Sequence, residues 1–170
     1  MRIEDLQEED LEDIVEWFDV GVFRFFKEPI SVEKLRILLP LVENNRPSRI
    51  AKKVVDKNSA KIIGFVSSTI DWDNNMMHIR TLCTRPGYRC KGIGLFMMDE
   101  ILKICFDVLK LHRAQLFVDE WNSAAVSFYD KLKFHKDGLM REAVKINNQY
   151  KGWYCMSMLA REWERRSIVD

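Results

Sequence analysis

Long apolar runs, a strong charge of one sign and closely spaced cysteines are all missing from this 170-residue sequence. Its 27 basic and 26 acidic residues leave a formal net charge of +1, so no global field draws the chain to nucleic acid or to an anionic membrane. No apolar stretch approaches the roughly 20 residues that a bilayer-spanning helix needs. We therefore expect no nucleic-acid partner, no membrane partner and a cytoplasmic location.

The spacing of cysteine and histidine argues against a structural metal site. None of the four cysteines belongs to a Cys-x-x-Cys pair, and none of the three histidines has a neighbour at the short spacing of a zinc site. The acidic start Met1–Asp5 does not resemble a secretory leader, so nothing implies an oxidising compartment. We expect reduced thiols and no bound metal.

The length and the 47% hydrophobic content fit one domain spanning residues 1–170. Hydrophobic periodicity predicts helices over about 8–18, from Ser31 to before Arg46, over 95–108 and over 123–132, while β-branched runs predict the strands. The strands are expected over 50–55, 61–70, 76–84 and 114–118, with two closing strands beginning at Phe134 and Tyr150. Turn residues at 56–59, 73–75 and Asn147–Asn148 favour hairpins, so we expect an α/β (α+β) class with antiparallel pairing.

The stretch between the strand predicted over 76–84 and the next helix has the composition of an anion-binding loop. Pro86-Gly87 marks a turn, and Arg89-Cys90-Lys91-Gly92-Ile93-Gly94 then opens the helix. Backbone N–H groups at a helix start point at one place and carry partial positive charge. Glycine lets a phosphate approach the backbone closely, and Arg89 and Lys91 add positive charge. The loop therefore predicts a pyrophosphate site.

Two other classes of phosphate-binding loop do not fit the surrounding residues. The dinucleotide fingerprint needs a third glycine and a preceding parallel βαβ sheet, and neither is present around Gly92 and Gly94. A P-loop needs Gly-Lys-Ser/Thr at the helix start, but Gly94 is followed by Leu95. Both alternatives are excluded.

The loop from Arg89 to Gly94 resembles that of the GCN5-related N-acetyltransferase (GNAT) superfamily. Its signature is Arg or Gln, two residues, Gly, one residue, then Gly or Ala, and Arg89, Gly92 and Gly94 match it. The segment Asn122–Phe134 resembles the second signature of the family, Asn then Ala then Tyr, which usually closes on Gly-Phe. In this sequence Lys133 stands where that glycine is usual.

The C-terminal portion is similar to the subgroup of ribosomal-protein N-terminal acetyltransferases and spermidine acetyltransferases. The similarity lies in the run Gly138–Val144, the Asn147–Asn148 turn and the final Glu162-Trp163. The resemblance covers about residues 1–163. One departure is Gly152, where an Asp is common in that subgroup, so the role of that carboxylate in acceptor binding is open.

The resemblance implies a central mixed, mostly antiparallel sheet of six to seven strands flanked by about four helices. Strands four and five, here 76–84 and 114–118, are expected to splay apart and to hold the pantetheine arm of acetyl-CoA between them. Acetyl-CoA is thus the implied acyl donor, without a metal. The implied cofactor-binding residues are Leu82, Cys83, Thr84, Arg89, Cys90, Lys91, Gly92, Ile93, Gly94, Leu95 and Asn122.

The implied reaction is direct attack by the amine, which must lose a proton while the departing thiolate gains one. Tyr129 matches the family position whose hydroxyl lies near the thioester sulfur, and it is the candidate acid. His78, on the strand that leads to the site, and Glu120, just past the next strand, are the candidate bases, with a water chain as the alternative. Asn122 is expected to bind the pantetheine, to cap its helix, or both. An acyl-cysteine route through Cys90 is not expected, because no histidine is placed by the sequence to activate it.

The sequence does not choose among a protein N-terminus, a polyamine and an amino sugar as the acceptor. A polyamine predicts an acidic pocket on the first two helices, for which Asp19, Glu28, Glu33 and Glu43 are available. The alternative function is a non-catalytic acyl-CoA sensor or interaction module with the same fold. We expect a monomer or a homodimer.

Overall fold

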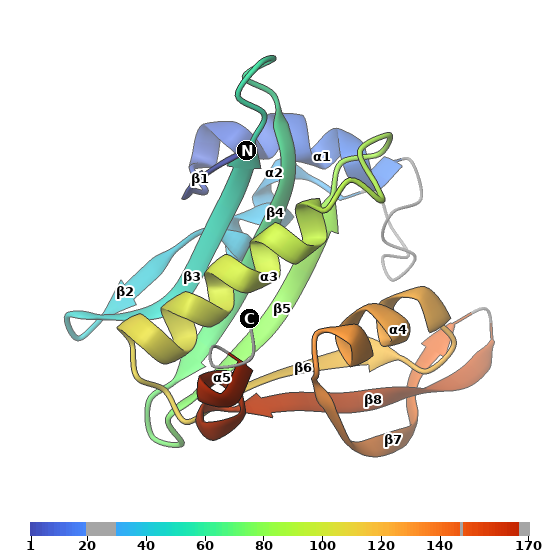
Figure 1. Cartoon of the computed structure of the whole chain (residues 1–170). Helices are drawn as coiled ribbons and strands as arrows, with labels where there is room; N and C mark the ends of the chain where they lie inside the picture. The colour runs from blue at the N-terminus through green and yellow to red at the C-terminus, as the bar shows by residue number, and fades with distance from the viewer. Residues whose placement is uncertain (20–29, 147, 167–170) are drawn as a thin grey trace. The chain divides into compact units, whose positions relative to one another are not determined.

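The computed structural model describes residues 1–19, 30–146 and 148–166, and Figure 1 labels its elements. The helices and strands in chain order are β1 (Arg2–Asp5), α1 (Leu11–Asp19), α2 (Val32–Leu35), β2 (Leu41–Glu43), β3 (Arg46–Val55), β4 (Ile62–Asp71), β5 (Met76–Thr84), α3 (Ile93–Lys103), β6 (Arg113–Asp119), α4 (Ser123–Lys131), β7 (His135–Ile146), β8 (Gln149–Leu159) and α5 (Ala160–Arg166). Single-turn 3-10 helices, η1 (Glu8–Asp10) and η2 (Arg36–Leu38), precede α1 and follow α2. The π-helix η3 (Ile104–Val108) continues α3.

The strands are ordered β1-β3-β4-β5-β6-β8-β7, with β2 paired to β3. The β5–β6 pair is parallel, and the pairs β1–β3, β3–β4, β6–β8 and β7–β8 are antiparallel. The expected α/β class with a mixed, mostly antiparallel sheet is confirmed. The described residues form eight strands instead of six to seven, and five α-helices instead of about four. The additional elements, such as β1, β2 and α5, are too short to leave a clear periodic pattern.

The chain divides into two compact units. The first comprises Met1–Ile70 and Arg80–Ile101, and the second comprises Asp71–Ile79 and Leu102–Asp170. Strand β5 is divided after Ile79, where its parallel pairing with β6 also ends. The paired residues are the first four of each strand, Met76–Ile79 and Arg113–Leu116, which agrees with strands that pair at one end only.

In the first unit, α1 buries an apolar face against the sheet. Leu11, Ile14 and Trp17 are each at most 2% exposed, and they share one core cluster with Phe65 of β4. The Trp17 and Phe65 rings lie 5.8 Å apart. The spacing of apolar residues by three and four positions in the sequence therefore predicts this helix correctly.

The prediction of a helix from Ser31 to before Arg46 is largely wrong. Its start is confirmed, because the Ser31 hydroxyl accepts the Lys34 N–H at 3.3 Å as an N-cap. The helix, however, ends with η2, and the chain then forms the β2–β3 hairpin through Asn44 and Asn45, whose φ angles are 51° and 59°. The apolar run at 37–42 is too short for its period to distinguish helix from strand, and the Asn-Asn pair is the turn signal that decides it.

In the second unit, β6 buries alternate residues, whereas β8 buries three successive residues, Met156, Ser157 and Met158. Ala114, Leu116 and Val118 of β6 are at most 6% exposed, as the period of two requires. Helix α5 is fixed by Trp163, whose Nε1 donates to the Asp107 carboxylate of η3 at 2.9 Å. Asn148 adopts a φ of 64° before β8, whereas Asn147 of the expected turn lies outside the described residues.

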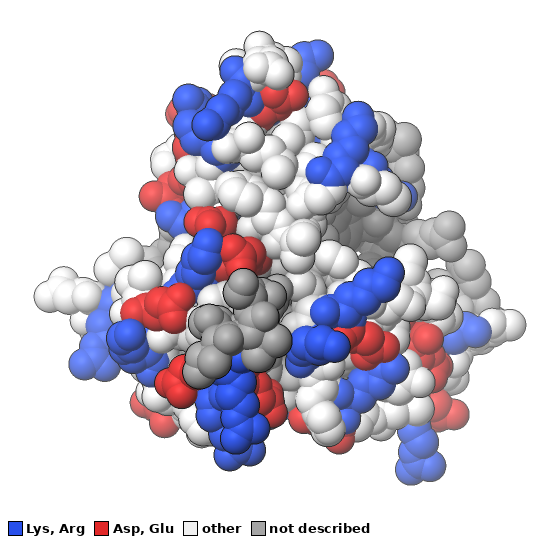
Figure 2. Space-filling model, in the orientation of Figure 1, with Lys and Arg blue, Asp and Glu red and all other residues white. Residues whose placement is uncertain are grey.

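Charges of both signs are mixed on the face of the molecule drawn in Figure 2, in line with the small net charge. Neither sign forms a continuous field on that face. Within the described ranges, no helix is both long and apolar enough to cross a membrane.

Candidate functional site

The loop between β5 and α3, in the first unit, has an alternating backbone conformation. Cys90 and Gly92 adopt φ angles of 61° and 77°, on either side of Lys91. Alternation between right-handed and left-handed residues turns successive N–H groups toward one side and makes an anion-binding concavity. A Cβ on Gly92 would meet no atom within 4 Å, so the positive φ, not crowding, is what favours glycine there.

Helix α3 begins where this loop ends. The Phe96 N–H donates to the Gly92 carbonyl at 3.0 Å, which is the first hydrogen bond of the helix. The N–H groups of Ile93, Gly94 and Leu95 therefore precede any acceptor within the helix. Together with the helix dipole, they form a site for an anion.

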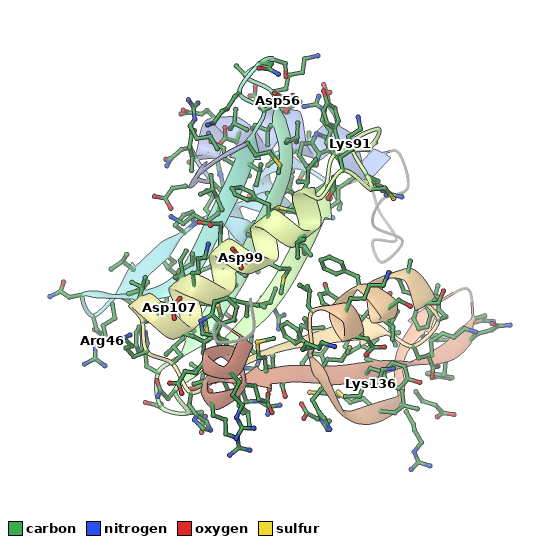
Figure 3. The ribbon with its side chains drawn as sticks, in the orientation of Figure 1. Arg46, Asp56, Lys91, Asp99, Asp107 and Lys136 are labelled. Atoms are coloured by element: carbon green, nitrogen blue, oxygen red, sulfur yellow. The ribbon has the colours of Figure 1, made fainter. Side chains whose placement is uncertain are left out.

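Basic side chains surround this helix start. Arg89 and Lys91 are exposed, and Figure 3 shows Lys91 on the loop beside the first turn of α3. The Lys91 ammonium lies 4.8 Å from the centre of the Tyr88 ring, and such a cation–π contact leaves its charge in place. The residues present thus fit the pyrophosphate of a coenzyme A derivative.

Gly64 of β4 determines how closely α3 approaches the sheet, and it is not among the site residues expected from the sequence. A Cβ on Gly64 would lie 2.9 Å from Ile93 Cγ2, 3.0 Å from Met97 Sδ and 3.1 Å from the Cys83 carbonyl oxygen. Figure 1 shows α3 lying over the strands of this unit, with its axis running along them. An isolated glycine within a strand pattern is the signal that could have indicated this close approach.

Arg85, directly after β5, fixes the start of the loop. Its Nη1 donates to Asp13 Oδ2 at 2.7 Å and to the Ile62 carbonyl at 3.0 Å. Its guanidinium carbon lies 5.5 Å from the centre of the Trp17 ring. These contacts join the end of β5 to α1. No pattern in the sequence indicates them, because the partners are distant along the chain.

At the end of β5, Cys83 faces the core and is 3% exposed, while Leu82 and Thr84 are partly buried. Burial raises the pKa of the Cys83 thiol to about 12, against the opposing effect of the Arg89 charge. Its thiol is therefore neutral at physiological pH. If this strand contacts the pantetheine, its backbone groups are the ones available.

In the second unit, Asn122 is the N-cap of α4. Its Oδ1 accepts the Ala125 N–H at 3.1 Å. At the other end of α4, Lys133 has a φ of 66° and its N–H donates to the Asp130 carbonyl at 3.0 Å. Lys133 thus ends α4 in the left-handed conformation that glycine most often adopts after a helix, so the lysine does not prevent this helix end from forming.

Tyr129 lies in an aromatic environment on α4. Its ring is 5.2 Å from Phe128 and 5.8 Å from Phe134, both in edge-to-face contact. The residue keeps part of its surface exposed, yet burial of the phenol raises its pKa to about 12. Tyr129 is therefore protonated at neutral pH and can donate a hydrogen bond.

His78 is held by Gln115, which is not among the site residues expected from the sequence. It is the register partner of Gln115, and the Gln115 amide nitrogen donates to His78 Nδ1 at 2.9 Å. The Gln115 amide oxygen in turn accepts from Arg113 Nε at 3.1 Å. The lone pair of Nδ1 is thus engaged, and the neutral ring carries its proton on Nε2.

Glu120 follows β6 and bonds to Gly152 of β8. Its Oε1 accepts the Gly152 N–H at 2.7 Å, and its own N–H donates to the Gly152 carbonyl at 3.2 Å. A Cβ on Gly152 would lie 3.0 Å from Glu120 Oε2 and 2.9 Å from Leu139 Cδ1. The Gly152 departure therefore makes room for this carboxylate.

Of the acids expected to line an acceptor pocket, Glu33 is exposed on α2 and Glu43 lies on β2, not on a helix. Glu28 lies outside the described residues, as does the side chain of Asp19. Among the side chains of the described ranges, no group of three or more His, Cys, Asp or Glu could hold a metal ion.

Comparison with known proteins gives a consistent result. Residues 6–134 match the model of the acetyltransferase (GNAT) family. Spermidine N(1)-acetyltransferase of Vibrio cholerae is 24% identical over 145 residues, which cover 84% of this chain and 82% of that protein. The Escherichia coli K12 protein of the same name is 30% identical over 78 residues, or 46% and 42% of the two chains.

The fold has solved counterparts. A crystal structure of spermidine N-acetyltransferase from Vibrio cholerae in complex with CoA and spermine has a TM-score of 0.81 at 22% identity, covering 96% of this chain and 97% of that chain. A crystal structure of the spermidine/spermine N-acetyltransferase from the same organism in complex with manganese ions has a TM-score of 0.77 at 23% identity, covering 98% and 96%.

Proposed function

Because the chain belongs to the acetyltransferase (GNAT) family, we propose that it transfers the acetyl group of acetyl-CoA to a primary amine of a polyamine. Members of this family carry out an acyl-CoA-dependent N-acetyltransferase reaction with acetyl-CoA as the donor. The resemblance to this family that the sequence indicates is therefore confirmed. The acceptor is the proposed part. Its support is that relatives from two bacteria bear the name spermidine N(1)-acetyltransferase.

For the donor, the proposed pyrophosphate site is the loop from Arg89 to Gly94 and the helix start at Leu95. The observation that supports it most strongly is the alternating backbone of Cys90, Lys91 and Gly92 before three helix N–H groups. The backbone of residues 82–84 is the proposed contact for the pantetheine arm. Asn122 has its Oδ1 engaged as a cap, so its amide nitrogen is the group left to donate to the cofactor.

For the reaction, the acceptor nitrogen attacks the thioester carbon, the C–N bond forms and the C–S bond breaks. Tyr129 is the proposed donor to the departing sulfur. A phenol of pKa about 12 is a weaker acid than a thiol of pKa about 8.5, so its contribution is greatest as a hydrogen bond that strengthens while negative charge develops on sulfur. Nε2 of the neutral His78 ring carries the proton and Nδ1 accepts from the Gln115 amide, so His78 serves as the proposed base only where Nδ1 exchanges that hydrogen bond for the proton of the amine.

The test is an acceptor panel. The protein is incubated with acetyl-CoA and spermidine, spermine, an amino sugar or a peptide with a free N-terminus, and released CoA thiol is measured. We expect the polyamines to give the highest kcat/KM. If a peptide or sugar is preferred by tenfold or more, the polyamine proposal is wrong, and if acetyl-CoA raises the Tm but no amine releases thiol, the chain is a sensor.

The donor site is tested by Gly92→Glu. The positive φ disfavours any side chain by roughly 1–2 kcal/mol, and a carboxylate at the phosphate position adds repulsion, so we expect acetyl-CoA affinity to fall by on the order of 100-fold or more. Gly138→Glu is the matched control, since a Cβ there meets nothing within 4 Å. Equal affinities of the two variants, measured by calorimetry, would show that the loop is not the donor site.

The remaining expectations stay predictions. We propose a single catalytic domain spanning residues 1–170, a cytoplasmic location and a monomeric or homodimeric state. Size-exclusion chromatography with light scattering measures the last of these, and a larger assembly would contradict it.

A further inference from the structure

We propose that the Glu120 carboxylate binds an ammonium group of the acceptor and that Gly152 positions it for this role. The inference rests on the proposed amine acetyltransferase function and deepens it, because it assigns a residue to acceptor recognition. It concerns the second unit only, where β6, β8 and α4 meet.

The carboxylate is oriented by the backbone at the end of β6. The strand ends at Asp119, and a turn closed by the Asn122 N–H and the Asp119 carbonyl, 3.0 Å apart, begins there. Gly152 pairs with the residue after the strand end, and its N–H donates to the side chain of Glu120 at 2.7 Å. This hydrogen bond fixes the position of Oε1, and it therefore also fixes the direction in which Oε2 points.

Glycine at position 152 leaves the Glu120 carboxylate in this place. A Cβ would lie 3.0 Å from Oε2 and 3.1 Å from the carboxylate carbon of Glu120, which is closer than ordinary Cβ contacts, so the carboxylate would have to move by a few tenths of an ångström. Gly152 also lies opposite a bulge in β7, because Met140 pairs with Trp153 and Val144 pairs with Lys151. The bulge leaves Gly152 without a register partner in β7.

The bulge also opens space at this edge of the sheet. Its residues Arg141 and Glu142 line a cavity of about 440 Å³, and Glu142 adopts a φ of 54°. The cavity adjoins the bulged part of β7, which lies opposite Gly152, the residue that binds the Glu120 carboxylate.

The charge of Glu120 is not neutralised within the described part of the chain. Its hydrogen bonds there are those to Gly152, and no basic side chain of that part forms an ion pair with it. The residue is exposed, so the carboxylate is accessible to a dissolved cation. A polyamine carries several ammonium groups at neutral pH, since such amines have pKa values near 10. An oriented, accessible carboxylate is the group that would select them.

The test compares Glu120→Gln with Glu164→Gln, measured with the amine that the wild type acetylates fastest in the panel. Glutamine keeps an oxygen that accepts the Gly152 N–H and removes only the charge. We expect the KM for the amine to rise about 5- to 20-fold with a smaller change in kcat. Glu164, exposed on α5, controls for the loss of one negative charge and should leave both constants unchanged.

Gly152→Ala tests the positioning role. It should raise the KM as Glu120→Gln does, and the double variant should be no worse than either single one, because both act through the same carboxylate. A rise in the KM that adds in the double variant would overturn the positioning role. Circular dichroism and the Tm identify a variant that fails to fold, in which case Glu120→Asp, which keeps the charge but shortens the side chain away from the Gly152 N–H, replaces it.

The outcomes distinguish this inference from the proposed function. If the wild type acetylates an amine but Glu120→Gln leaves its KM unchanged, the inference is wrong while the function stands. If instead kcat falls and the acidic limb of the kcat pH profile disappears, Glu120 is a base and the binding role is wrong. If the wild type acetylates no amine in the panel, the proposed function fails, and the inference fails with it.

Discussion

Replacing Gly64 by alanine tests whether the close contact between β4 and the start of α3 builds the donor site. In a strand with free space, alanine is more stable than glycine by roughly 0.5–1 kcal/mol. Here the new methyl would lie 2.9 Å from Ile93 Cγ2 and 3.1 Å from a backbone oxygen, well inside the usual carbon contact distance of about 3.5–4.0 Å. Ile93 is β-branched and the oxygen belongs to β5, so neither can move by a simple rotation.

Overpacking of this kind costs about 1–3 kcal/mol, which exceeds the gain in strand propensity. We therefore expect the free energy of unfolding to fall by about 1 kcal/mol, which lowers the Tm by roughly 2–4 °C in a protein of this size. Since Ile93 is the first residue of α3, the helix start shifts as well, and the KM for acetyl-CoA should rise on the order of tenfold.

The assays are urea unfolding followed by circular dichroism and steady-state kinetics at varied acetyl-CoA. Gly138→Ala is the matched control, because that site in β7 has no atom within 4 Å of the new methyl and should gain stability. The reasoning is refuted if Gly64→Ala is as stable as Gly138→Ala, or if it is destabilised with no change in the KM for acetyl-CoA.

Three further predictions concern α4 and the residues that end it. Tyr129→Phe should lower kcat by about 100-fold or more while leaving acetyl-CoA affinity intact, and an unchanged kcat would contradict the acid assignment. Burial raises the pKa of Tyr129 to about 12 from 10.0, so the unfolded chain loses this proton first and stability falls between pH 10 and 12, by roughly 1.4 kcal/mol per pH unit. Alkaline urea titrations should show a smaller fall in Tyr129→Phe. Lys133→Gly should raise the free energy of unfolding by about 1 kcal/mol, because the φ of 66° suits glycine, and a loss of stability would show that the lysine side chain is needed.

Much of the fold could be predicted because its signals are local. The face formed by Leu11 and Ile14, the alternation in β6 and the turn where the Asn58 N–H donates to Asp56 at 2.8 Å depend on residues close in sequence. The segment after Ser31 was predicted incorrectly, because a short apolar run fits helix and strand equally well. Pairing with β3 decides between them, and pairing is a long-range interaction.

Some residues of the candidate site also have a local signal in the sequence, and others do not. The loop from Arg89 to Gly94 could be found from its glycines and its place before a helix, and the Asn122 cap from its residue type. By contrast, the interaction of His78 with Gln115 spans 37 residues and that of Glu120 with Gly152 spans 32. No local pattern indicates such partners, although each changes what the candidate base can do.

By itself, the sequence determined the family, the donor loop and most helices and strands, because backbone conformation and hydrophobic period are encoded within a few residues of each position. The tertiary structure alone decided what a side chain at Gly64 or Gly152 would contact, what holds Arg85 and His78, and where the Glu120 carboxylate points. These features depend on the space and hydrogen-bond partners provided by strands and helices that are remote in the chain, and only the folded packing specifies them.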